Sequence, residues 1–234
     1  MSDDKSCPRS RRWCWMCAFD GTCINRFGDC VSLRITNTCF YLERKKMLNT
    51  MNQIVPGSIA DVAKTTGKSI AQTFMHAKVV TIVDVSGSMG TLDSTGGQSR
   101  YSVACKELAF IQKQNPGKVA VIAFSDNSEF CPGGVPFFEG GGTDLAGALR
   151  YAKIADIPGM NIIVISDGEP NKPDTVLEVA RTYKNKISVI YVGPEQRPYG
   201  RDFLHKLANV TGGQTITADT ARELSKSVQY LMAG

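Results

Sequence analysis

The sequence lacks any apolar run of the roughly 18 residues that a membrane-spanning helix requires. The stretch MSDDKSCPRSRRWCW at its start also lacks the apolar segment of a secretory signal. Both absences argue against a membrane protein and against export by the general secretory route. We therefore expect a protein that is cytoplasmic, or that belongs to a particle assembled inside the cell, with no membrane partner.

Histidine is scarce, because the chain contains only His76 and His205. Neither can be paired from the sequence with a serine or cysteine as the base of a nucleophilic catalyst. Two glycine-dependent motifs are also incomplete. TTGKSI (65–70) lacks the first glycine of a phosphate-binding loop, since Val62 stands there, and in SGSMG Ser86 stands where a nucleophile elbow requires glycine. These absences predict that the chain is not an enzyme.

The composition is that of a domain with a real core. Of 234 residues, 42% are hydrophobic and 21% are charged. The net charge of +5 is uneven, since residues 1–50 hold nine Lys/Arg and five Asp/Glu, and six of the eight cysteines lie within the first 39 residues. We predict a small Cys-rich module at 1–45, a helical linker at 46–76 that packs on the main domain, and the main domain at 77–234.

The Cys-rich module spaces its cysteines as C-x6-C-x2-C-x5-C-x6-C-x8-C. A module of this size has too little core to fold without a staple. With no signal peptide, bound metal is favoured over disulfides, so we predict a zinc site of the ribbon or knuckle type, with disulfides and free thiols as the alternatives. The expected ligands are Cys14, Cys17, Cys23 and Cys30, with Cys7 or Cys39 as alternative ligands.

Basic and aromatic residues adjoin each other in the same module. Arg9, Arg11 and Arg12 come just before Trp13 and Trp15. Arginines can neutralise phosphates and tryptophans can stack on bases, so the module offers an alternative function in nucleic-acid association. Tryptophans that build a small core and arginines that face solvent would explain the same pattern, and we favour that interpretation.

The main domain alternates strand and helix patterns. Short β-branched runs predict strands, and longer amphipathic segments predict helices. Such alternation implies an α/β fold with a doubly wound, mostly parallel central sheet flanked by helices. Before it, residues 46–77 predict one broken or two short helices, with Gly67 as the break. The expected strands are 78–85, 118–125, 160–168, 187–193 and 214–218; the expected helices are 99–117, 143–155, 172–186, 202–213 and 220–234.

Oxygen-bearing side chains gather where ligands bind in such sheets, beyond the carboxyl ends of the strands. The first strand ends in Asp84, Ser86 and Ser88 within KVVTIVDVSGSMG. Thr143 follows three glycines in EGGGTDLAGAL, and Asp167 follows a later strand in ISDGEP. Hydroxyls combined with carboxylates suit a hard cation such as Mg²⁺. Without Thr143 and Asp167, helix capping would explain DVSGS equally well.

These segments resemble the von Willebrand factor A (vWA) domain and its metal-ion-dependent adhesion site (MIDAS). The family pattern is D-x-S-x-S, then a threonine, then an aspartate, on successive loops. Here these are DVSGS, GGTDL and SDGEP, and the resemblance covers about residues 77–232. DVSGSM is also similar to the intracellular type of the family. The resemblance implies Mg²⁺ or Mn²⁺ held by the five matching positions: Asp84, Ser86, Ser88, Thr143 and Asp167.

The resemblance also implies a mechanism and a class of partner. In the family the two serines and the threonine can bind the ion directly, the aspartates act partly through water, and one position is left for a partner's Asp or Glu. Intracellular relatives commonly serve as scaffolds or as adaptors of AAA+ ATPases, and a structural role in a large particle is related. We expect a non-enzymatic, metal-dependent protein-binding module.

Overall fold

The computed structural model describes residues 53–93, 97–168, 170–193, 198–217, 226 and 228–230. The chain divides into two units, 1–50 and 51–234, and every described residue belongs to the second. The predicted Cys-rich module therefore lies outside the described residues. Its zinc ligands and its basic and aromatic residues stay predictions: Cys7, Cys14, Cys17, Cys23, Cys30 and Cys39, and Arg9, Arg11, Arg12, Trp13 and Trp15.

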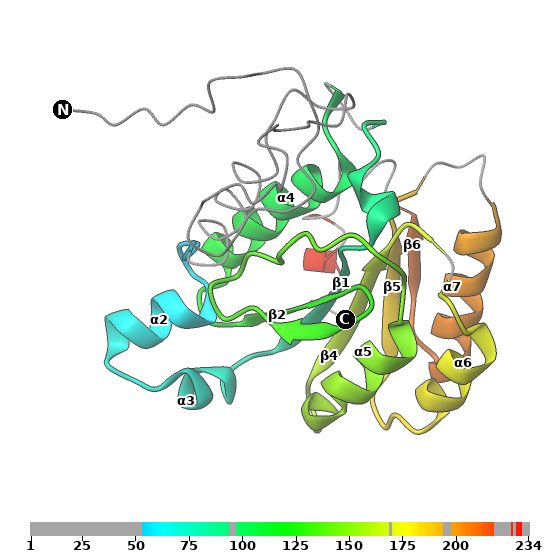
Figure 1. Cartoon of the computed structure of the whole chain (residues 1–234). Coiled ribbons are helices and arrows are strands. Elements are labelled where there is room, and N and C mark those ends of the chain that lie inside the picture. The colour runs from blue at the N-terminus through cyan, green and yellow to red at the C-terminus, as the bar shows by residue number, and fades with distance from the viewer. Residues whose placement is uncertain are drawn as a thin grey trace, which may run out of the picture. The chain divides into compact units, whose positions relative to one another are not determined.

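A six-stranded sheet forms the centre of the described part of the chain (Figure 1). Its order is β3-β2-β1-β4-β5-β6, and every neighbouring pair is parallel except β2 and β3. This is the order of doubly wound α/β proteins, with β1 between β2 and β4. The strands are β1 Val79–Asp84, β2 Val119–Phe124, β3 Ser128–Phe130, β4 Asn161–Ser166, β5 Ile187–Tyr191 and β6 Thr215–Thr217.

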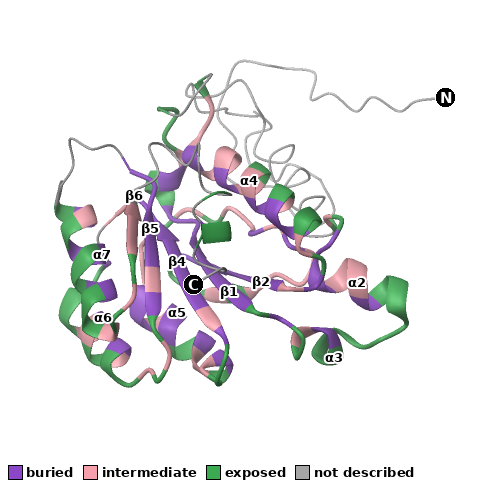
Figure 2. Ribbon diagram, turned by 180° about the vertical axis from the view of Figure 1, so that it is seen from behind, coloured by how far each residue is buried: buried purple, intermediate pink, exposed green. Residues whose placement is uncertain are grey.

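The central strands are buried on both faces, as their β-branched runs predict. All six residues of β1 and all six of β2 are buried, and Figure 2 shows the interior strands in purple. Alternate residues point to opposite faces, so Val80 and Ile82 belong to one hydrophobic cluster and Val79 and Val83 to the other.

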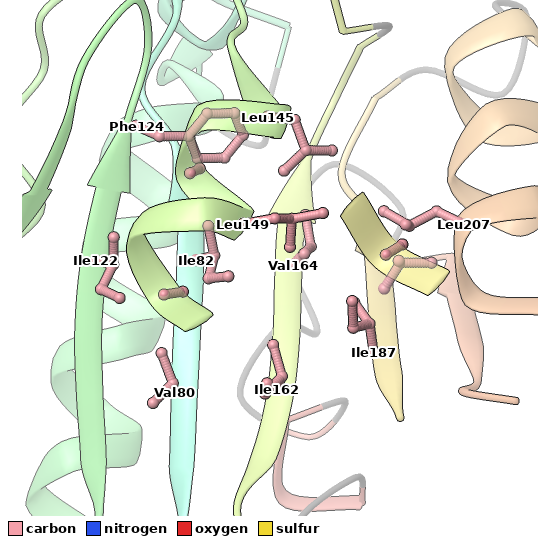
Figure 3. Packing of buried hydrophobic residues seen from close by; sticks show 14 of the residues in the cluster. Val80, Ile82, Ile122, Phe124, Leu145, Leu149, Ile162, Val164, Ile187 and Leu207 are labelled. Carbon is pink, nitrogen blue, oxygen red and sulfur yellow. The ribbon is translucent and has the colours of Figure 1, made fainter. Parts of the chain in front are cut away.

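Helices cover both faces of the sheet. On one face pack α5 (Leu145–Ala152), α6 (Pro173–Arg181) and α7 (Pro198–Thr211), and Figure 3 shows Leu145, Leu149 and Leu207 against strand residues. On the other face, α4 (Arg100–Gln114) packs through a stripe that includes Ala104, Leu108 and Ile111. The predicted α/β fold class is thus confirmed. The part of the chain that the structure describes also contains the 3₁₀ helices η1 Gly87–Gly90 and η3 Lys153–Ala155.

In the described residues, two short helices precede the sheet, α2 (Ile59–Thr66) and α3 (Ile70–Phe74). Gly67 follows α2 with φ of +66°, a left-handed conformation that ends a helix and that glycine adopts at low cost. Ser69 then caps α3 in a capping box with Gln72. Phe74 packs edge-on against Phe130 of β3, with ring centroids 5.6 Å apart. Among the described helices, none has the length and apolar character to cross a membrane.

Candidate metal site

The first part of the site is the turn that follows β1. Asp84 is fully buried at the end of β1, and its two carboxylate oxygens accept two different hydrogen bonds. Oδ1 accepts from the backbone N–H of Ser86 at 2.8 Å, and Oδ2 accepts from the hydroxyl of Ser166, at the end of the neighbouring β4, at 2.5 Å. Asp84 therefore fixes the direction in which the chain leaves the sheet.

The two serines that follow lie side by side. Ser86 is buried and precedes η1, whereas Ser88 within η1 is exposed. Their hydroxyl oxygens are 3.2 Å apart, and the Ser88 hydroxyl donates to Oδ1 of Asp167 at 2.8 Å. The structure thus joins Ser86 and Ser88 after β1 to Asp167 after β4, although 79 positions separate Ser88 from Asp167 in the sequence.

The glycine-rich loop before α5 brings Thr143 to the same region. Its glycines bond to the turn after β1: the N–H of Gly140 donates to the carbonyl of Val85 at 3.0 Å, and that of Gly87 to the carbonyl of Gly141 at 3.2 Å. On its other side, Asn171 accepts from the Thr143 N–H at 3.3 Å and donates to the Thr143 carbonyl at 3.0 Å. All three predicted segments therefore meet at the carboxyl ends of β1 and β4.

Asp126 shapes the glycine-rich loop, and sequence reasoning assigned it no role. Its Oδ2 accepts from the N–H of Gly142 at 3.0 Å. A Cβ at Gly141 would lie 2.3 Å from Oδ2 and one at Gly142 would lie 2.6 Å from Oδ1, so a side chain at either position would displace this carboxylate from the loop. Gly141 also has φ of +77°.

Arg100 is the most prominent residue of the site that the sequence did not predict. Its side chain is only 2% exposed at the start of α4. Nη1 donates to Oδ2 of Asp167 at 2.5 Å, Nε donates to Oδ1 of Asp93 at 2.8 Å, and Nη2 donates to the second Asp93 oxygen. The hydrogen bonds to Asp93 raise the pKa of Arg100 above its usual value, so the guanidinium stays charged.

Burial dominates the electrostatics of Asp84. Desolvation raises its pKa from 3.8 to about 6, against the opposing effect of the hydrogen bonds from Ser166 and Ser86. The charged carboxylate is therefore held at a cost in free energy, and a nearby positive charge would favour it.

The donor set fits a hard cation. In an octahedral shell with bonds of about 2.0–2.1 Å, neighbouring oxygens lie about 2.9 Å apart. The hydroxyl pair at 3.2 Å and the Ser88–Asp167 pair at 2.8 Å are close to this spacing. No group of three or more His, Cys, Asp or Glu residues clusters in the described part of the chain. The oxygens that meet at the site belong to the hydroxyls of Ser86 and Ser88 and the carboxylate of Asp167, and they are not the thiolate or imidazole ligands that zinc prefers.

Comparisons with known proteins define the fold. No family model matches the chain, and no curated protein matches it. Among solved structures, BatB from Bacteroides thetaiotaomicron is similar with a TM-score of 0.53 and 18% identity, over 67% of this chain and 97% of that chain. An aerotolerance-related membrane protein from Bacteroides fragilis is similar with a TM-score of 0.52 and 17% identity, over 67% of this chain and 98% of that chain. A von Willebrand factor type A protein from Catenulispora acidiphila has a TM-score of 0.49 and 17% identity, over 67% of this chain and 42% of that chain.

At these identities the similarity concerns the fold alone. The strand order and the Bacteroides structures agree on a doubly wound α/β fold, which is the fold that the resemblance to the vWA domain predicts.

Proposed function

We propose that the chain is a non-enzymatic protein-binding module that holds an acidic side chain of a partner protein through a divalent cation, Mg²⁺ or Mn²⁺. The observation that carries the proposal is the convergence of three separate segments on one point. Ser86, Ser88 and Asp167 form a continuous group of oxygens there, and the backbone contacts of Thr143 bring the third segment beside them.

Each predicted ligand has a distinct structural task. Asp84 is buried and holds the turn, so it acts from behind the site. Ser88 is exposed and therefore lies on the side from which a partner arrives. A bound cation would supply one electrophilic position for the partner's carboxylate. Because neutral hydroxyls make up most of the donor set, little of the cation's charge would be neutralised by the protein.

The arrangement does not favour catalysis. The Ser88 hydroxyl donates to a carboxylate that also bonds Arg100, and no histidine contact in the described part of the chain reaches it. His205 Nδ1 lies 3.1 Å from the hydroxyl of Thr215, and His76 precedes β1 at the end opposite Asp84. A serine nucleophile needs an adjacent base, which this site does not provide.

A paramagnetic titration tests the metal site directly. Mn²⁺ would be added to the full chain while the relaxation of water protons is followed, because bound Mn²⁺ with an open coordination position relaxes exchanging water efficiently. We expect saturable enhancement, displacement by Mg²⁺, and a decrease when excess acetate occupies the open position. Asp84→Asn should weaken Mn²⁺ binding. No enhancement in the wild-type chain would contradict the proposal.

The partner would be found by affinity capture from the native source. Wild type in Mg²⁺, wild type in EDTA and Ser88→Ala in Mg²⁺ would serve as three baits, with mass spectrometry as the readout. We expect a partner that is retained only by the first bait. Partners captured equally by all three would contradict a metal-bridged contact.

A further inference from the structure

Arg100 places a fixed positive charge beside the proposed metal site. Asp167 is buried, and its two oxygens have different partners: Oδ1 accepts from Ser88 at 2.8 Å and Oδ2 accepts from Nη1 of Arg100 at 2.5 Å. Only Oδ1 therefore faces the serines. The guanidinium decides which carboxylate oxygen is available to a cation.

We infer that Arg100 is a resident cation of the site: it holds Asp167 in place when no metal is bound, and it weakens metal binding by competing for the same carboxylate. This inference rests on the proposed function. Arg100 is a positioning residue, because it acts through Asp167. Its consequence is a site that stays assembled without metal and binds metal most firmly when a partner's carboxylate adds negative charge.

The burial of the pair supports this role. The Arg100 side chain is 2% exposed, so its charge is weakly screened and Asp167 would otherwise be a buried carboxylate without a cation. A metal at the oxygens of Ser86, Ser88 and Asp167 would meet the field of the guanidinium across a single carboxylate group. Like charges at such range repel, and the repulsion lowers the affinity for the metal.

Asp93 moderates the same charge from outside. It binds Nε and Nη2 of Arg100, and its side chain is 34% exposed, so it faces solvent more than Asp167 does. Asp93 therefore partly neutralises Arg100 and ties the backbone just after η1 to the start of α4. The two aspartates lie on different atoms of one guanidinium, so separate substitutions can distinguish charge from anchoring.

The test compares Mg²⁺ binding and thermal unfolding of the full chain, in Mg²⁺ and in EDTA. We expect Arg100→Gln to lower the melting temperature in EDTA. Mg²⁺ should restore much of that melting temperature, because the metal replaces the missing charge. Calorimetry should show that the Arg100→Gln variant binds Mg²⁺ more tightly than wild type. We expect its dissociation constant to be about tenfold lower, which corresponds to about 1.4 kcal/mol. Arg100→Lys keeps the charge but cannot reproduce the paired bonds to Asp93, so its dissociation constant should change less than that of Arg100→Gln without matching wild type.

Asp93→Asn is the decisive companion variant. It exposes the metal to the full charge of Arg100, so we expect weaker Mg²⁺ binding, opposite in sign to Arg100→Gln. Arg150→Gln, at an exposed position of α5, controls for the overall change in charge and should leave the dissociation constant unchanged.

The inference is overturned if Arg100→Gln weakens Mg²⁺ binding, or if it loses the same stability with and without Mg²⁺. Should Arg100→Gln fail to fold in either condition, tighter or unchanged binding by Asp93→Asn would also overturn it. Absence of any Mg²⁺ effect in all variants, wild type included, would instead contradict the proposed function.

Discussion

The hydroxyl of Ser166 lies 2.5 Å from Oδ2 of Asp84, across the boundary between β4 and β1. Both side chains are buried, so this hydrogen bond joins two neighbouring strand ends beneath the site. Because Asp84 has little access to solvent, the hydrogen bond from Ser166 stabilises its ionised carboxylate and opposes the rise in its pKa.

Ser166→Ala should therefore destabilise the chain in a pH-dependent manner. A hydrogen bond to a charged group contributes about 1.5–3 kcal/mol, and we expect a loss in that range at pH 8, where Asp84 is ionised. At pH 5, where Asp84 is mostly protonated, the loss should be smaller. Urea unfolding at both pH values measures the difference, and an equal loss at both would contradict this role of Ser166.

The raised pKa of Asp84 predicts how the metal-free chain responds to pH. Its folded pKa of about 6 exceeds the ordinary value of 3.8, so the folded state binds the proton more tightly than the unfolded state does. The contribution to stability is full below about pH 4 and is lost as the pH rises through about 6, on the order of 2–3 kcal/mol.

Asp84→Asn should remove that part of the pH dependence in EDTA. Mg²⁺ favours the ionised carboxylate, so its affinity for the wild-type chain should fall up to about tenfold per pH unit below pH 6. Thermal unfolding measures the pH dependence of stability, and calorimetry measures that of the Mg²⁺ affinity. Both would be carried out at about eight pH values between about 4.5 and 8. A Mg²⁺ affinity that does not depend on pH would show that Mg²⁺ binding is not coupled to the ionisation of Asp84.

Ser88→Ala tests a proposed ligand directly. The Ser88 hydroxyl donates to the buried carboxylate of Asp167, so we expect its loss to lower the free energy of unfolding in EDTA by about 1.5–3 kcal/mol. Because Ser88 is a proposed direct ligand, its loss should also weaken Mn²⁺ binding at least about tenfold, which is about 1.4 kcal/mol. Thr65→Ala, on the exposed face of α2, is the matched control. Unchanged Mn²⁺ affinity would remove Ser88 from the ligand set.

The glycine-rich loop offers a matched pair of substitutions. Gly142→Ala would place a Cβ 2.6 Å from Oδ1 of Asp126 and 2.9 Å from Nδ2 of Asn171, so it would displace the two side chains that hold the loop carrying Thr143. At Gly140 a Cβ meets nothing within 4 Å, and only the φ of +76° disfavours alanine. We expect both to lose about 1–2 kcal/mol of stability, but only Gly142→Ala to weaken Mn²⁺ binding severalfold.

The zinc prediction for residues 1–45 can be measured independently. We expect the purified full chain to carry about one zinc ion, as determined by elemental mass spectrometry, and to lose it when Cys14 and Cys17 are replaced by serine. Asp84→Asn should leave the zinc content unchanged. Zinc-free protein whose cysteines resist alkylation until reduced would favour disulfides instead.

The sequence pattern was sufficient for the fold class and for bringing the proposed ligands together. β-Branched runs separated by amphipathic helices define a parallel sheet, and the carboxyl ends of parallel strands share one edge. The proximity of Asp84 to Ser166 and of Ser88 to Asp167 follows from β1 and β4 being neighbours. The metal itself and its five ligands stay a prediction.

Arg100 and Asp126 show what the pattern could not supply. An arginine at the start of an amphipathic helix is expected to face solvent, and the burial of Arg100 results from carboxylates of two other segments. Asp126 lies in a short connection, and only the folded glycine loop makes it a hydrogen-bond acceptor. β3 was also not predicted, because a strand of three residues is too short to show alternation.

That short strand has a consequence for solubility. Edge strands with unpaired backbone groups can recruit strands of other molecules and start aggregation. β3 offers only three residues, with exposed Glu129 at its centre, and Pro132 follows two residues after its end without a backbone N–H to donate. This edge of the sheet therefore resists the addition of a strand from another molecule.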